Sequence, residues 1–340
     1  VEAETNIARN LGVDIRYGAR AIRLTRQHDR VTGVEVKQAG ATYQINARAV
    51  VLAAGGFQAN PEMRARYLGP GWELAKVRGS RFNTGAGIRM ALDIGAAPYG
   101  NWSGCHAVAW ELNAPEFGDL GIGDMFQKHS YPFSLCVNLN GERFLDEGAD
   151  FRNYTYAKYG RVILQQPQQT AWQVFDSKVT HLMRDEYRIK QVTRVQADTI
   201  EALAHTLATE HGMNEKNFLH TVTDYNAAVR EDIAFDPTIK DGKKTEGLPL
   251  NKHNWATRLD SPPYEAFGVT CGITFTFGGL RIIPTGEVLD EDLEPIPGLF
   301  AAGELVGGVF YHNYPGGTGL MNGAVFGKIA GANAANSHKP

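Results

Sequence analysis

A glycine-rich loop near the end of the chain carries the most specific chemical pattern in the sequence. Residues 312–320 are HNYPGGTGL, and Met321, Val325 and Ile329 follow at helical spacing. A loop of this kind opens a helix whose first N–H groups have no partner within the helix. It therefore presents those groups, with the positive end of the helix dipole, to something electron-rich. The alternative is a tight turn before a helix that packs through small residues.

Three other glycine-bearing turns favour a binding role for this loop. They are residues 53–56 (AAGG), 84–87 (TGAG) and 303–304 (GE). Two of them follow continuous apolar runs, residues 49–54 and 298–302, which are typical of strands buried on both faces of a parallel sheet. Because parallel strands end at one edge of their sheet, we expect all four glycine elements to meet there. A large flat cofactor at that edge explains the pattern better than coincidence does.

The remaining elements divide the chain into three segments. Alternating residues predict a strand at 13–17, a hairpin over 21–36 and another strand at 42–46. Helical spacing predicts helices near 198–212 and 214–229, and residues 233–263 have the composition of a long surface excursion. The predicted fold is an interrupted α/β domain, residues 1–105 and 272–340, with an α+β capping domain, residues 106–271, inserted between its halves. A binding crevice is expected where the insertion meets the parent sheet.

Composition narrows the class of partner. The 340 residues carry 34 basic and 37 acidic side chains, a net charge of −3, so no basic field is present to hold nucleic acid or an anionic membrane. No apolar run approaches the ~20 residues of a membrane span. The three cysteines, without a Cys-x-x-Cys pair, predict a reducing, cytoplasmic setting and no metal site. A small molecule is the expected ligand.

An ordered set of motifs resembles the fumarate reductase and succinate dehydrogenase flavoprotein superfamily. The motifs are residues 49–56 (AVVLAAGG), 84–87 (TGAG), 138–147 (NLNGERFLDE), 277–279 (FGG) and 297–304 (PGLFAAGE). Within the superfamily, residues 309–320 (VFYHNYPGGTGL) are most similar to FAD-dependent tricarballylate dehydrogenases and more distantly to 3-ketosteroid dehydrogenases. The resemblance implies that the domain is Rossmann-like and that the cofactor is FAD.

The resemblance assigns the flavin-contacting positions to the four glycine elements. The expected cofactor-binding residues are Ala54, Gly55, Gly56, Thr84, Gly85, Gly87, Gly303, Glu304, Gly316, Gly317, Thr318, Gly319 and Leu320. Ala86 is a departure, because the superfamily commonly has aspartate there. Family members also open with a strand and a Gly-x-Gly-x-x-Gly turn that bind the FAD pyrophosphate. No such unit is found here, so we expect a fragment that lacks the first βαβ unit and binds FAD less well.

Arg152 is the candidate proton carrier. In fumarate reductases an arginine with that role lies a few residues after the Arg-Phe-x-x-Glu motif, which here ends at Glu147. An arginine has a solution pKa above ~12, so it can act as a base only where desolvation and neighbouring cations lower that value. The alternatives are a clamp for a substrate carboxylate and an ordinary ion pair with Glu147 or Asp150.

The resemblance also implies that three other residues face the substrate. His106 corresponds to a carboxylate-binding histidine, with a purely structural histidine as the alternative. Thr276 and Tyr314 are expected to hold carboxylates or to polarise one, although Tyr314 can also simply pack on its neighbours. The superfamily's second histidine and its loop arginine are replaced by Phe275 and Tyr314, which disfavours plain fumarate reduction.

The combined expectation is oxidation of tricarballylate to cis-aconitate, with a hydride passing to flavin N5. The electrons would then pass to a redox partner, which the resemblance suggests is membrane-bound. Arg78 and Arg81 could supply further charge for a polycarboxylate, or could be ordinary surface residues. The alternatives are a 3-ketosteroid or fumarate reductase type of flavin enzyme, and an inactive fragment that binds a partner or a small anion.

Overall fold

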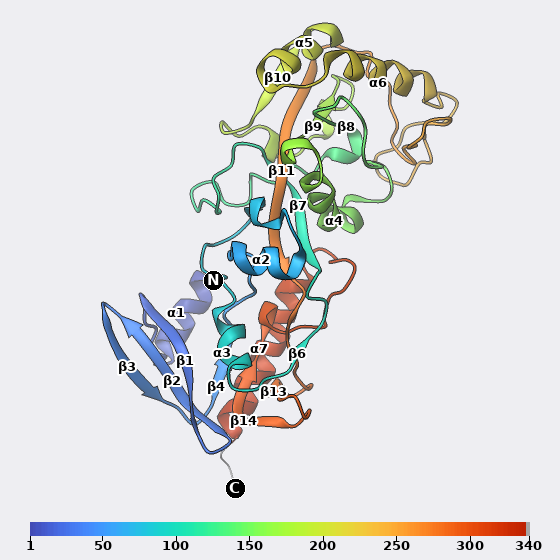
Figure 1. The fold of residues 1–340 in the computed structure, drawn as a ribbon. Coiled ribbons are helices and arrows are strands. Elements are labelled where there is room, and N and C mark those ends of the chain that lie inside the picture. The colour runs from blue at the N-terminus through green and yellow to red at the C-terminus, as the bar shows by residue number, and fades with distance from the viewer. Residues whose placement is uncertain (338–340) are drawn as a thin grey trace.

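A long strand organises the computed structural model, which describes residues 1–337. Strand β11 (Tyr264–Thr276) runs from the top of an elongated molecule, beside α5, down to its middle (Figure 1). It pairs antiparallel with β7 (Cys105–Glu111), β9 (Ala171–Phe175) and β10 (Arg194–Ala197), and parallel with β5 (Lys76–Val77). Strand β8 (Leu135–Asn138) extends this six-stranded sheet beyond β9. The first and last thirds of the chain are thereby joined to its middle.

The N-terminal elements largely follow the sequence pattern. Helix α1 (Glu2–Asn10) precedes an antiparallel sheet of β1 (Ala19–Gln27), β2 (Arg30–Gln38) and β3 (Ala41–Asn46), which confirms the predicted hairpin and third strand. The strand predicted at residues 13–17 is wrong. That segment pairs with no strand among the described residues, and Tyr17 is exposed.

The two ends of the chain share one sheet, as predicted. Strand β4 (Val50–Leu52) pairs in parallel with β14 (Pro295–Ala301), and β13 (Glu287–Leu289) pairs with the other side of β14. The prediction that β4 is buried on both faces is wrong, because Leu52 is buried but Val51 is 38% exposed. Strand β4 lies at the edge of this sheet, and the C-terminal helix α7 (Thr318–Asn336) packs mainly on β14.

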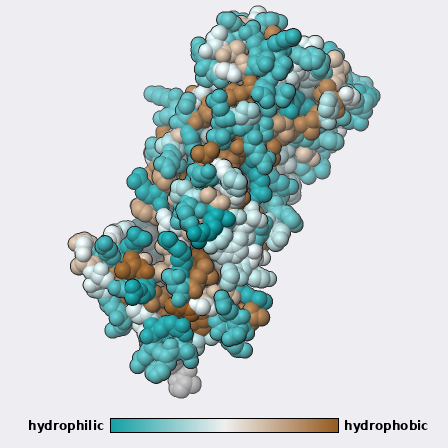
Figure 2. Space-filling model, in the orientation of Figure 1, coloured by the Kyte–Doolittle hydropathy of each residue, from teal (hydrophilic) through white to brown (hydrophobic). Residues whose placement is uncertain are grey.

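Short elements connect this sheet to the capping part. These are α2 (Pro61–Leu68), α3 (Ala86–Leu92) and the paired strands β6 (Pro98–Tyr99) and β12 (Gly279–Leu280). A mainly aliphatic core with Phe57 and Trp72 holds them against β4, β14 and the lower half of β11. Figure 2 shows apolar surface in this lower part of the molecule, around α3 and α7.

The capping part has its own core. Helix α4 (Arg152–Leu164) packs along β7. Helix α5 (Ile200–His211) covers β10 and the far end of β11, and α6 (Glu215–Ala228) packs against α5. The helices predicted near 198–212 and 214–229 are confirmed. Residues 233–263 are mostly irregular, as expected, but they are not wholly on the surface, because Lys252 and Trp255 are buried.

Two further features concern the cysteines and the helices. Cys105, Cys136 and Cys271 are free and buried. Among residues 1–337, no helix has the length and apolarity needed to cross a bilayer.

Candidate functional site

The glycine turns meet in space, as predicted from their places at strand ends. The Gly85 N–H donates to the Gly56 carbonyl over 3.0 Å. A Cβ atom at Gly56 would collide with the Thr276 hydroxyl and the Glu304 carboxylate, and one at Gly87 would lie 2.7 Å from Leu305 Cδ1. Only glycine permits this approach, which explains part of the high glycine content.

Glu304 is a half-buried residue that joins these turns. Its Oε1 accepts from the Thr276 N–H at 2.9 Å, and its Oε2 accepts from Gln58 Nε2 and Asn83 Nδ2, both at 3.1 Å. Desolvation of its carboxylate raises the pKa of Glu304, and these donors act in the opposite direction. Thr276 is fully buried, and its hydroxyl accepts from the Phe57 N–H at 3.3 Å. The positions predicted to touch FAD and substrate therefore brace the turns; direct contacts to either ligand stay predictions.

The loop before α7 has the geometry expected of a cofactor-facing turn. Gly317 is the N-cap at φ 85° and has no side chain to cap the helix. The Tyr314 hydroxyl accepts from the Gly319 N–H at 2.9 Å, and the Thr318 hydroxyl donates to the Pro315 carbonyl at 2.6 Å. Gly316, Gly317 and Leu320 are exposed beside this helix end, as are Ala53 and Ala54 after β4. Small, exposed groups next to a helix N-terminus fit a flat, polar-edged ring such as a flavin.

Two buried histidines and two tyrosines form a cluster where this loop meets α4. The His106 ring stacks on Tyr314 with centroids 4.5 Å apart, and Tyr156 approaches His106 at 4.9 Å and His129 at 5.2 Å. Both ring nitrogens of His106, and Nε2 of His129, are buried without a hydrogen-bond partner among the described residues. Orphaned buried nitrogens of this kind point to a missing polar ligand.

The electrostatics of the cluster keep both imidazoles neutral. Burial lowers the pKa of His106 well below its usual value, and the positive charge of Arg78 lowers it further. The same two causes, followed by the charge of Arg152, lower the pKa of His129. A neutral imidazole offers one N–H donor and one acceptor nitrogen. Each histidine can therefore donate its single N–H to a carboxylate oxygen without carrying a positive charge.

Arg152 lies at the first position of α4 and borders the same cluster. Its Nη1 is 3.4 Å from His129 Nδ1, and its guanidinium lies 5.8 Å from the centre of the Tyr156 ring. Burial lowers the pKa of Arg152, and the like charge of Arg184 lowers it further. The positive end of the α4 dipole also disfavours the protonated form.

The ion-pair alternative for Arg152 is not what the structure shows. Glu147 pairs instead with Arg143 at 2.6 Å, and Asp150 pairs with Lys240 at 3.5 Å. Within the described part of the chain, Arg152 forms no salt bridge. The roles of proton carrier and carboxylate clamp both remain as predictions.

Tyr156 and His129 were not among the residues expected from the sequence. Tyr156 lies four residues after Arg152, so a helix starting at Arg152 places both on one face, and that spacing could have indicated it. No local pattern marks His129, which reaches the cluster through the packing of an irregular segment before β8.

Two hollows lie next to the cluster. The Arg152 hollow has a volume of about 490 Å³; it is lined by His129, Arg152 and Arg184 and by apolar groups that include Phe133 and Trp255. The Arg78 hollow has a volume of about 560 Å³, and its lining includes Arg78, Trp110, Asp124 and Thr274. Trp110 and His106 are on the same face of β7, since they are separated by four residues of one strand.

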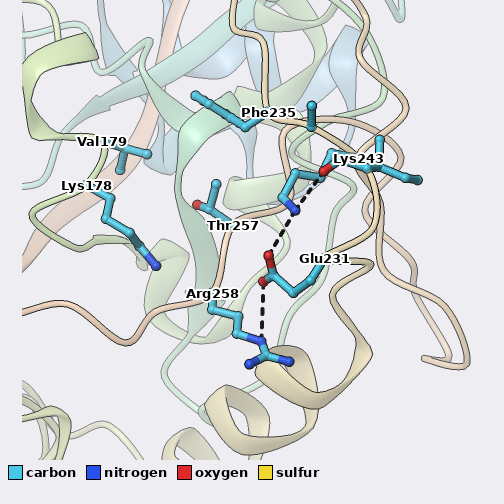
Figure 3. Close-up of a pocket in the computed structure, with 9 residues that line it drawn as sticks. Lys178, Val179, Glu231, Phe235, Lys243, Thr257 and Arg258 are labelled. Atoms are coloured by element: carbon cyan, nitrogen blue, oxygen red, sulfur yellow. Dashed lines mark hydrogen bonds and ion pairs between the residues drawn. The ribbon is translucent and has the colours of Figure 1, made fainter.

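A third hollow of about 380 Å³ lies apart from the cluster, in the capping part (Figure 3). Glu231 bridges Lys243 Nζ at 3.2 Å and Arg258 Nε at 3.3 Å across it. Lys178 on its rim pairs with Asp176 at 3.3 Å. Because its charges are paired with one another, this hollow has no free charge for a ligand.

A family model described as "FAD binding domain" matches residues 3–320. The chain belongs to this FAD-binding family. A probable fumarate reductase of Shewanella frigidimarina is 34% identical over 339 residues, which cover 96% of this chain and 51% of that protein. The FAD cofactor and the mixed α/β fold expected from the sequence are confirmed at the level of the family.

Solved structures of FAD-binding family members superpose along the chain. An open flavocytochrome c3 fumarate reductase matches with a TM-score of 0.76 and 31% identity, covering 99% of this chain and 55% of that one. A 3-ketosteroid Δ1-dehydrogenase of Sterolibacterium denitrificans matches with a TM-score of 0.72 and 25% identity, covering 98% and 62%. The chain thus spans little more than half the length of these relatives.

Proposed function

We propose that the protein is an FAD-dependent oxidoreductase that acts on a CH–CH bond of a small polycarboxylate, with tricarballylate oxidised to cis-aconitate. The observation that carries this proposal is the cluster of Arg152, His129 and His106. It combines a cation of lowered pKa with two neutral imidazoles, and both ring nitrogens of His106 and Nε2 of His129 are buried with no hydrogen-bond partner among residues 1–337. Carboxylate groups are the ligands that satisfy such a set.

FAD, when bound at the glycine turns, supplies the acceptor for the hydride that leaves one of the two carbons. Arg152 takes the proton from the adjacent carbon, which lies beside a carboxylate. Burial and the charge of Arg184 lower the pKa of Arg152, which shifts it toward the neutral form that is required before it can accept a proton. His129 Nδ1, 3.4 Å from Arg152 Nη1, helps to orient the guanidinium.

His106 and Tyr314 hold the substrate from the opposite side. The stacked pair is anchored by the bond between the Tyr314 hydroxyl and the Gly319 N–H, so His106 is held rigidly beside the loop that faces the flavin. An N–H of His106 can donate to a carboxylate that gains negative charge as the proton leaves, which stabilises the transition state. An electron-accepting redox protein, membrane-bound or soluble, then reoxidises the enzyme.

A second candidate is a 3-ketosteroid type of dehydrogenase. Tyr314 lies in an aromatic cluster with Phe275, Phe277 and Phe310, which offers apolar surface beside a hydroxyl that could polarise a ketone. Arg152 and Arg184 line the hollow beside the cluster, and a neutral steroid has no anionic group for them to bind. We therefore favour the polycarboxylate.

The experiment that separates these candidates uses the full-length, FAD-loaded protein. Reduction of an artificial electron-accepting dye is measured with tricarballylate, succinate and a 3-ketosteroid. We expect turnover with tricarballylate above that with succinate and none with the steroid. Turnover of the steroid alone would refute the polycarboxylate proposal.

A further inference from the structure

Arg78 is placed beside the cluster by the central sheet. It directly follows β5, and its N–H donates to the Ile273 carbonyl of β11 at 2.9 Å. Val77 and Ile273 pair in the ladder and are both buried in the core. Successive side chains of a strand alternate between faces, so Arg78 lies on the opposite face from Val77, where Thr274 also lines the Arg78 hollow.

The guanidinium of Arg78 is held in a fixed orientation. Its Nε and Nη2 donate to the two carboxylate oxygens of Asp124, each at 2.6 Å, and Nη2 also donates to Gln127 Oε1 at 3.2 Å. Among residues 1–337, no hydrogen bond is found for Nη1. A guanidinium held at one edge by a carboxylate, with the N–H groups of Nη1 left over, can donate to a second carboxylate through Nη1.

The positive charge of Arg78 reaches the substrate-facing cluster. After burial, it is the next cause that lowers the pKa of both His106 and His129. Burial raises the pKa of Tyr156 and of Tyr314, and the charge of Arg78 acts to lower both values. The partner Asp124 is half exposed and is therefore screened by water more than Arg78, whose side chain is 17% exposed.

The superfamily positions that would otherwise bind carboxylates carry no charge in this chain. Phe275 and Tyr314 stand where the fumarate reductases are expected to have a histidine and an arginine. Phe275 instead joins the aromatic cluster, and the Tyr314 hydroxyl is occupied by the Gly319 N–H. A polycarboxylate with three negative groups needs more cations than Arg152 alone provides.

We propose that Arg78, oriented by Asp124, binds a carboxylate that Arg152 does not reach, and so gives the site its preference for a tricarboxylate over a dicarboxylate. This inference rests on the function proposed above. Arg78 is a residue for binding and specificity, and it takes no part in moving the proton.

The test compares tricarballylate with succinate in Arg78→Gln, Arg78→Lys and Asp124→Asn forms of the full-length, FAD-loaded protein. We expect Arg78→Gln to lower the ratio of kcat/KM for tricarballylate over that for succinate at least tenfold, mainly through KM. Asp124→Asn should lower it less, because the guanidinium stays but loses its fixed orientation. Arg78→Lys should retain more of the ratio than Arg78→Gln does, since the ammonium group keeps the positive charge but lacks the paired N–H donors of a guanidinium.

Arg66→Gln is the control, because Arg66 is exposed on α2, pairs with Glu62 and lines neither hollow. It should leave the ratio within twofold of the wild type. An equal loss with both substrates in Arg78→Gln, or an unchanged ratio, would overturn the specificity role while leaving the proposed function intact. Failure of the wild-type protein to use either polycarboxylate would instead overturn both.

Discussion

Replacing Arg152 is the sharpest perturbation of the proposed mechanism. Arg152→Lys keeps a positive charge but loses the planar group that places Nη1 3.4 Å from His129 Nδ1. Arg152→Met removes the proton-accepting group altogether. A positioned acid or base contributes about 10²–10⁴-fold to a rate, so turnover should fall by at least a hundredfold in both variants. That factor corresponds to an increase of about 3–5 kcal/mol in the activation barrier.

The assay is the anaerobic rate of flavin reduction in the full-length protein, measured together with flavin content. Flavin content should not change, because Arg152 begins α4 and does not lie on the glycine turns. Lys158→Arg is the control, since Lys158 is exposed on the same helix and its substitution should leave the rate within twofold. A rate within tenfold of the wild type in Arg152→Met would refute the role of Arg152 as proton carrier.

Three further predictions concern groups around the site. Arg184→Gln removes the like charge that helps to lower the pKa of Arg152, so the rising limb of the pH profile of kcat/KM should move to higher pH; an unmoved limb would contradict this coupling. Glu304→Ala leaves three donors unpaired and should lower the free energy of unfolding by about 3 kcal/mol at pH 5, measured by denaturant titration. Because burial raises the pKa of Glu304, the stability it contributes is complete below its unfolded value of 4.5 and is lost as pH rises through the folded pKa, so the deficit should be smaller at pH 8. Gly56→Ala should lower thermal stability through overpacking by about 1–3 kcal/mol, whereas Gly331→Ala, with open space at its Cβ position in α7, should be neutral or stabilising.

The glycine turns could be predicted from the sequence because the signal for each of them lies within a few neighbouring residues. A glycine after an apolar strand signals either a positive φ or a close approach, and both are found here. Gly55 has a φ of 70°, and Gly56 contacts Thr276 and Glu304. The parallel pairing of β4 with β14 could likewise be predicted, since two apolar runs ending in glycine indicate neighbouring strands.

Other features depend on contacts between distant segments and could not be predicted. Residues 13–17 alternate like a strand, but alternation does not supply a partner, and none of the described strands provides one. Val51 belongs to an apolar run but lies in an edge strand, so its exposure depends on the order of the strands. His129 carries no periodic signal and becomes part of the site only through its contacts with Arg152 and Tyr156.

Anaerobic mixing of the full-length, oxidised holoprotein with tricarballylate tests the central claim most directly. The flavin absorbance and the organic product are followed together. The structure leads us to expect loss of the oxidised flavin band with formation of an equal amount of cis-aconitate. An oxidised flavin that persists with tricarballylate, but is reduced by a 3-ketosteroid, would contradict the claim.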